Sequence, residues 1–92
     1  MEFEWDDEKA EENLAKHGVS FPQATIAFQD RFAIEFLDES ENYGEHRFIL
    51  IGLTENQLLT VAFTERAERI RIISARRAKR YEQEYYNSQN IF

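Results

Sequence analysis

The sequence contains no cysteine, two widely separated histidines and no long apolar run. Without cysteine there can be no disulfide framework and no thiolate zinc site. His17 and His46 lack a spaced acidic pair, so they are a weak signal for a metal site. No apolar run approaches the ~20 residues that span a membrane, and the acidic start of the chain is unlike a signal or transit peptide. We therefore expect a cytoplasmic protein that needs no membrane, metal or cofactor.

Aromatic residues are plentiful, and they supply the core that a small chain needs. The 92 residues include eight Phe, four Tyr and one Trp, which bury large apolar areas. A chain of this length buries only about 60–65% of its unfolded surface, so its stability margin is thin. We expect one domain at residues 1–92. Its core should include Trp5, Phe21, Phe28 and Phe63, rather than these rings stacking on a ligand.

Charge is unevenly distributed along the chain. The net charge of −7 makes the protein a poor general binder of nucleic acid. Residues 1–45 carry three basic and thirteen acidic side chains, whereas residues 46–92 carry eight basic and five acidic ones. Most of the basic residues lie between Arg66 and Arg80. This pattern allows a locally positive face on an acidic protein, although the same arginines can equally neutralise nearby glutamates.

The first residues have the pattern of a short strand followed by a helix. Alternation predicts a strand at residues 3–5, and Asp6 or Asp7 offers an N-cap for a helix at 7–17. Gly18 is expected to end this helix in the left-handed conformation. The buried face of the helix is predicted to contain Ala10, Leu14 and His17.

A second helix is predicted directly afterwards. Ser20 is its candidate N-cap, and Pro22 stands where a missing amide hydrogen costs little. The helix is expected to end near Gln29-Asp30. Its apolar stripe is formed by Phe21, Ala24, Ala27 and Phe28.

The second half of the chain alternates with a period of two, which predicts four strands and a final helix. The strands are expected at residues 32–36, 46–53, 58–64 and 69–73, with polar turns between them. These short connections favour antiparallel pairing, because a parallel crossover needs a dozen or more residues. Ser74 is the predicted N-cap of a helix at about 75–87.

These elements follow the order β-α-α-β-β-β-β-α. The order predicts an α+β domain of two layers, with a mainly antiparallel sheet and helices packed on one face.

Several segments resemble the BrnT family of bacterial toxins. FEWD at residues 3–6, Tyr43 with the following Gly-Glu, and TER at residues 64–66 carry part of the likeness. The most specific elements are KHGVSF at residues 16–21 and IRIISARRA at residues 70–78. The likeness extends over residues 3–86.

The resemblance implies a RelE-like fold and a place in a type II toxin–antitoxin system. Such toxins cut RNA, here mRNA with or without the ribosome, and so inhibit translation. A small ribbon-helix-helix antitoxin silences them in a complex expected to hold two copies of each protein. Operator DNA is contacted only through the antitoxin.

Metal-independent cleavage needs groups that stabilise a phosphate and groups that move protons. Arg66, expected in a turn, and Arg76, expected at the start of the last helix, are the main phosphate candidates, because a guanidinium grips two phosphate oxygens. The helix amides near Arg76 also attract phosphate. Arg77 and Arg80 are expected to follow the RNA backbone.

Proton transfer has several candidates. His17 and Glu65 are candidate catalytic groups, and Lys16 and Tyr43 are expected at the substrate. His17 can instead bond free carbonyls at its helix end, and Tyr43 can instead cover the sheet. Arg71 alternates with isoleucines and is expected to be structural.

Two other functions compete with the ribonuclease. The acidity of the chain suits a catalytically inactive binding module that acts as partner and co-repressor of a DNA-binding antitoxin. A structural domain without RNA contact is the third alternative.

Overall fold

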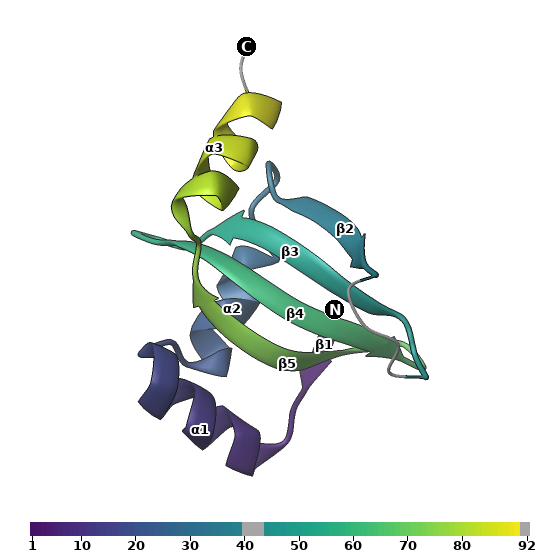
Figure 1. Ribbon diagram of the computed structural model, residues 1–92. Coiled ribbons are helices and arrows are strands. Elements are labelled where there is room, and N and C mark those ends of the chain that lie inside the picture. The colour runs from purple at the N-terminus through teal and green to yellow at the C-terminus, as the bar shows by residue number, and fades with distance from the viewer. Residues whose placement is uncertain (40–43, 91–92) are drawn as a thin grey trace.

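The computed structural model describes residues 1–39 and 44–90, which form five strands and three helices. The elements follow one another in the order expected from the sequence (Figure 1). They are β1 (Glu2–Glu4), α1 (Asp7–His17), α2 (Phe21–Ala27), β2 (Ile34–Asp38), β3 (Arg47–Leu53), β4 (Leu58–Arg66), β5 (Arg69–Arg77) and α3 (Arg80–Gln89).

The five strands form one mixed sheet in the order β1-β5-β4-β3-β2. Strands β2 to β5 pair antiparallel with their neighbours, as their short connections require. Strand β1 pairs with β5 in parallel, and the two N-terminal helices and strands β2 to β4 lie between them in the sequence. The α+β class and the mainly antiparallel sheet are therefore confirmed.

Helix α1 has the predicted ends, and of its predicted buried face Ala10 packs against the core and His17 is partly buried, but Leu14 is not buried. Asp6 accepts a hydrogen bond from the Lys9 amide at 3.1 Å, and Gly18 closes the helix at φ 70°. Leu14, expected to be buried, is 51% exposed, whereas Asn13 is 7% exposed. Asn13 is buried because its side chain bonds the backbone of β5, as described below.

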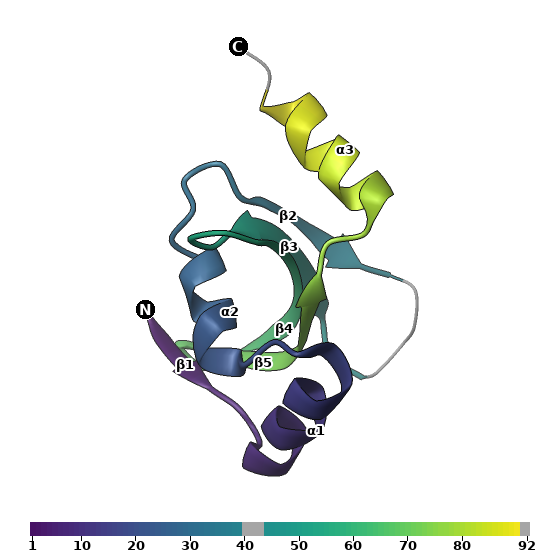
Figure 2. The same cartoon turned by 90° about the vertical axis from the view of Figure 1, so that its left-hand side faces the viewer.

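Helix α2 lies in the hollow of the curved sheet, where it covers β3, β4 and β5 (Figure 2). The Ser20 hydroxyl caps it by accepting from the Gln23 amide at 3.1 Å, as predicted. The helix ends at Ala27, two residues before the predicted end. The core between α2 and the sheet contains fully buried side chains, among them Phe21, Ala24, Ala27, Leu59, Val61 and Phe63.

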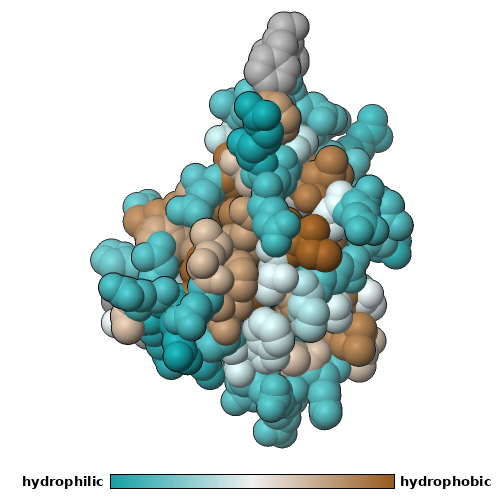
Figure 3. All heavy atoms as spheres, turned by 180° about the vertical axis from the view of Figure 1, so that it is seen from behind, coloured by the Kyte–Doolittle hydropathy of each residue, from teal (hydrophilic) through white to brown (hydrophobic). Residues whose placement is uncertain are grey.

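Aromatic rings extend this core. Phe28 packs edge to face on Phe63 at 5.0 Å between ring centroids, and Trp5 packs in the same way on Phe21 at 5.9 Å. The prediction that these four rings belong to the core is confirmed. Seen from behind, apolar side chains still lie in a band across the middle of the surface (Figure 3), since a small chain cannot cover all of its apolar surface.

The end of β5 and the start of α3 differ from the prediction. Ser74 is no helix cap, because β5 continues to Arg77 and the helix begins at Arg80. The antiparallel partner β4 runs alongside this whole stretch and supplies the ladder. A bulge in the β4–β5 pairing turns Ile72 and Ala75 to the same side, and this spacing of three imitates a helix in the sequence.

Helix α3 lies over the other face of the sheet, so the prediction that the helices pack on one face is wrong. Side chains alternate along β3: Leu50 points into the core under α2, whereas Ile49 and Ile51 line a cavity beneath α3. The two views place α2 and α3 on opposite sides of the strands (Figures 1 and 2). The side that carries α3 is called the open face below.

The remaining strands differ from the prediction only at their ends. β2 begins two residues late, because Asp30 first forms a turn by accepting a hydrogen bond from the Phe32 amide at 2.9 Å. β4 extends to Arg66, which is therefore the last residue of a strand rather than part of the turn. None of the described helices is long and apolar enough to cross a membrane.

Candidate nucleic-acid interface

Arginines from three strands project from the open face. Arg47 lies opposite Thr64 in the ladder, and Thr64 lies opposite Arg71, so these three residues form one row across β3, β4 and β5. Arg66 lies two residues beyond Thr64 on the same side of β4. Three of the eight basic residues in the second half of the chain are thus gathered on one side of the sheet at this end.

A cavity of about 130 Å³ lies among these arginines. Arg66, Arg47 and Arg71 line it from the sheet, and Asp6 and Lys9 line it from the start of α1, with Glu45 at the rim. We call it the Arg66 cavity.

A second cavity, of about 210 Å³, lies between α1 and β5. Lys16 and His17 line it from the end of α1, and Ser74 lines it from β5. It shares Lys9 and Ile73 with the Arg66 cavity, so the two adjoin and form one continuous surface. We call this surface the basic groove. Its charged residues are Lys9, Lys16, Arg47, Arg66, Arg71, Asp6, Glu12 and Glu45, with His17 beside them.

The cations of the groove differ in how firmly they are held. The Arg66 guanidinium lies 3.6 Å from the Glu45 carboxylate, and the two side chains are 52% and 32% exposed. An exposed pair of this kind contributes little, about 0–1 kcal/mol. Arg71 instead donates to Glu4 at 2.7 Å in a half-buried pair, which suits the structural role expected for it. Arg66 is therefore readily available to an anion.

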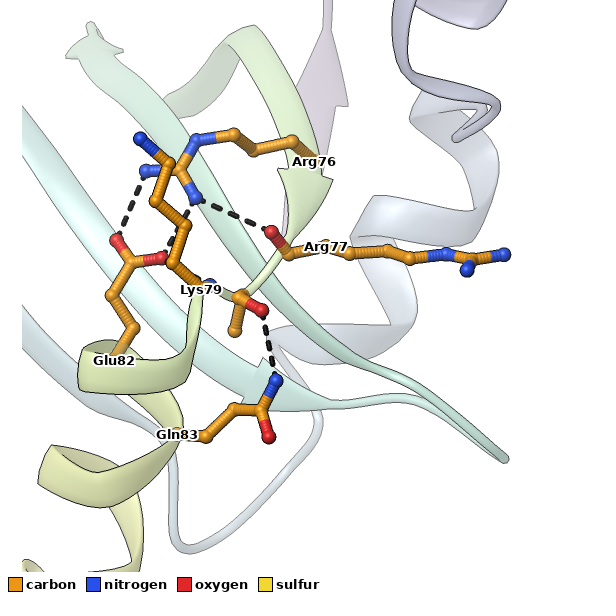
Figure 4. A network of polar contacts seen from close by, with 6 residues as sticks. Arg76, Arg77, Lys79, Glu82 and Gln83 are labelled. Carbon is orange, nitrogen blue, oxygen red and sulfur yellow. Dashed lines mark hydrogen bonds and ion pairs between the residues drawn. The ribbon is translucent and has the colours of Figure 1, made fainter.

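Arg76 is held much more firmly. Its guanidinium binds both oxygens of Glu82, Nη1 to Oε1 at 2.7 Å and Nη2 to Oε2 at 3.0 Å (Figure 4). The backbone amide of Lys79 donates to Glu82 Oε1 at 2.7 Å, so this carboxylate also caps the first turn of α3. The Glu82 side chain is 8% exposed. The predicted neutralisation of an arginine by glutamate is thus present here.

The pair alters the acidity of both groups. Burial alone would raise the pKa of the Glu82 carboxyl, but hydrogen bonds from Arg76 and the Lys79 amide outweigh it and hold the pKa below its ordinary 4.5. The hydrogen bonds to Glu82 raise the pKa of the Arg76 guanidinium. Both groups are charged across the physiological range.

Arg66 and Arg76 share the open face but not a cavity. Arg76 lies opposite Thr60 in the ladder, six residues from Arg66 along β4. At about 3.3 Å per residue, the two positions are roughly 20 Å apart. Arg76 lines the cavity under α3, not the Arg66 cavity. The two guanidinium groups therefore do not converge on one phosphate.

The other predicted site residues are scattered. Glu65 is exposed and points to the side of β4 opposite to Arg66, because side chains alternate along a strand. Arg77 points away from Arg76 (Figure 4), and Arg80 forms an exposed pair with Glu84 at 3.3 Å. Tyr43 lies outside the described residues.

Sequence reasoning missed Lys9 and Arg47 as groove residues. Lys9 stands seven residues before Lys16, two helical turns, which places both on one face of α1. That spacing could have identified it. The position of Arg47 depends on strand register, which the sequence does not reveal. Within residues 1–39 and 44–90, no three His, Cys, Asp or Glu side chains gather as a metal site would require.

The family model described as the ribonuclease toxin BrnT of type II toxin–antitoxin systems matches residues 5–82. A search of curated proteins found no match for this chain. The matched segment includes α1, the whole sheet from β2 to β5 and the start of α3, and therefore the basic groove. The chain belongs to the BrnT family of ribonuclease toxins of type II toxin–antitoxin systems.

Proposed function

We propose that this protein cuts mRNA without a metal ion, that its fold is RelE-like, and that the basic groove binds the RNA. The observation that carries the proposal is the union of the two cavities, which brings Lys16 and His17 of α1 to the same surface as Arg66. Family membership supplies the general activity of a ribonuclease toxin.

The basic groove is locally less acidic than the protein as a whole, which lowers its repulsion of RNA. Five of its side chains are cationic and three are acidic, apart from His17, whereas the whole chain carries −7. Repulsion from distant carboxylates is screened over about 8 Å at physiological salt. A phosphate in the Arg66 cavity therefore interacts mainly with the nearby guanidinium and ammonium groups.

In the proposed reaction, the 2′-hydroxyl loses its proton and attacks the adjacent phosphorus. The bond to the 5′-oxygen breaks, and that oxygen takes up a proton. Arg66 stabilises the charge on the phosphoryl oxygens, and we assign proton transfer to His17, which lines the adjoining cavity of the groove rather than the Arg66 cavity itself. Lys16 is proposed to hold a neighbouring phosphate.

The other site residues proposed from the sequence have less structural support as RNA contacts. Glu65 faces away from the groove, and Arg77 and Arg80 lie outside its lining. Arg76 would act on RNA only after Glu82 releases it. Tyr43, close in sequence to Glu45 of the Arg66 cavity, stays a proposed substrate contact.

The partner is proposed to be a ribbon-helix-helix antitoxin in a complex of two toxins and two antitoxins. Membership in a type II toxin–antitoxin family supports the existence of an antitoxin. The ribbon-helix-helix type, the stoichiometry and contact with operator DNA through the antitoxin rest on the resemblance alone.

The second candidate is a binding module that lacks nuclease activity. The buried Arg76–Glu82 pair favours it, and so does the separation of Arg76 from Arg66. Under this reading the chain acts through its antitoxin only.

Incubation of the purified protein with RNA in EDTA separates the two candidates. We expect cleavage by the native chain and at least a hundredfold slower cleavage by Arg66→Ala and by the Arg66→Ala, Arg76→Ala double variant. Arg31→Ala is the matched control, because Arg31 is exposed and lies over the Phe32 ring, away from the groove. Absence of cleavage by the native chain would favour the binding module, and equal cleavage by all proteins would indicate a contaminant.

A further inference from the structure

A cavity of about 540 Å³ separates α3 from the open face of the sheet. Phe36, Ile49 and Ile51 form its wall on the sheet, and Tyr81 and Tyr85 form its wall on α3. We call it the α3 groove. It is larger than either cavity of the basic groove and is mainly apolar.

The α3 groove is open because α3 is held at its two ends. At the start, Glu82 is bound to Arg76 of the sheet. At the end, the Tyr86 hydroxyl donates to Asp30 at 2.6 Å, and Asn90 donates to the Phe32 carbonyl at 3.2 Å. Between these ties the helix stands away from the strands and leaves room for apolar side chains of another molecule.

Three aromatic rings of the groove face solvent. Phe36 is 42% exposed, Tyr85 is 44% exposed and Tyr81 is 64% exposed. Phe36 and Tyr85 meet edge to face with ring centroids 6.4 Å apart, so they form a preformed aromatic corner. Exposed clusters of this kind mark interaction surfaces, and aromatic residues commonly supply most of the binding energy there.

The charges around the α3 groove favour a protein segment over RNA. Asp38, at the end of β2, is acidic and lines the groove. Arg76 and Glu82 also line it, but they neutralise each other. The groove therefore offers a phosphate no net positive charge, whereas a segment with apolar side chains and flanking Lys or Arg would be complementary to it.

Strand β2 adds a second point of attachment. It lies at the edge of the sheet, so one side of its backbone faces no strand of the described chain. An extended segment can pair with such an edge while its alternate side chains enter a neighbouring pocket.

We infer that the α3 groove and the edge of β2 bind an apolar segment of the antitoxin that carries basic residues at its ends. This inference rests on the antitoxin partner of the proposed function but not on the nuclease reaction. The segment packs on the corner formed by Phe36 and Tyr85 and lies against the Arg76–Glu82 pair.

The test measures the affinity of the purified toxin for the antitoxin encoded by its neighbouring gene. We expect the Phe36→Ser, Tyr85→Ser double variant to bind at least tenfold more weakly. Phe32→Ser is the matched control, because Phe32 is an aromatic residue with 41% exposure outside the groove, and it should bind within twofold of the native chain. RNA cleavage by each free toxin should be unchanged.

Equal antitoxin affinities for the groove variant and the control would overturn the inference. A loss of RNA cleavage with unchanged antitoxin affinity would also overturn it and would indicate that the groove binds RNA. Amide hydrogen exchange of the native toxin gives an independent measurement that needs no folded variant. Addition of the antitoxin should slow exchange at residues 34–38 and 80–89. Slowing confined to other segments would contradict the assignment. If the native chain cuts no RNA yet these results hold, the nuclease proposal fails and the docking site stands.

Discussion

Replacement of Asn13 by alanine should destabilise the protein by more than the loss of one hydrogen bond, because this side chain bonds three backbone groups. The Asn13 side chain donates to the carbonyls of Val19 at 2.9 Å and Ala75 at 2.8 Å, and it accepts from the Ala75 amide at 3.1 Å. Strand β1 pairs with β5 only as far as Arg71. Beyond that point Asn13 takes the place of a neighbouring strand.

The magnitude follows from the groups left behind. Alanine at position 13 would leave three buried backbone groups without partners, at about 1 kcal/mol or more each, so we expect a loss of roughly 3 kcal/mol. A chain of 92 residues has a total stability of about 5–14 kcal/mol. The melting temperature should fall by about 12–24 °C.

Urea denaturation followed by circular dichroism would measure this loss. Asn13→Asp keeps the acceptor for the Ala75 amide but places a buried carboxylate against the Val19 and Ala75 carbonyl oxygens, so its loss should be at least as large. Leu14→Ala is the local control, because Leu14 is 51% exposed and its replacement should cost under about 0.5 kcal/mol. A loss below about 1 kcal/mol for Asn13→Ala would refute the reasoning that this amide replaces a strand.

Three further predictions concern other contacts. Gly52→Ala would place a Cβ atom 2.5 Å from the Ala27 carbonyl oxygen and should cost about 3 kcal/mol in urea denaturation; an unchanged midpoint would contradict it. Glu82 has a lowered pKa, so its contribution to the free energy of unfolding is present above pH 4.5 and is lost as the pH falls through its native pKa. Glu82→Gln should reduce stability by about 2 kcal/mol at pH 7, and the difference in stability between this variant and the native chain should disappear in acid. Burial and the bond to Asp30 raise the pKa of Tyr86 to about 12, so this contribution is present below pH 10 and is lost as the pH rises towards 12; Tyr86→Phe should cost about 1–2 kcal/mol at pH 7, and an equal loss at pH 7 and pH 12 would contradict this linkage.

The sequence predicted those features that depend on neighbouring residues. The caps at Asp6, Gly18 and Ser20 are encoded within three or four positions, and all three are found as expected. The strand periodicity of the second half also needs no distant partner. These signals were sufficient for the α+β class and for the order of the elements.

The features that failed depend on distant partners. Asn13 is buried because Ala75 lies across the gap, 62 positions away in sequence. Arg76 seemed to begin a helix because Ser74 has the character of an N-cap, and only the register with β4 shows that β5 continues to Arg77. The basic groove likewise requires α1 to lie against β5, and neither composition nor periodicity contains that information.

The ends of the cleaved RNA test the central claim most directly. Attack by the 2′-hydroxyl must leave a 2′,3′-cyclic phosphate on one fragment and a 5′-hydroxyl on the other, and this should hold in EDTA. We predict these ends for the native chain and their loss in Arg66→Ala but not in Arg31→Ala. Products with a 5′-phosphate, or cleavage that EDTA abolishes, would contradict the proposal that the basic groove performs this chemistry.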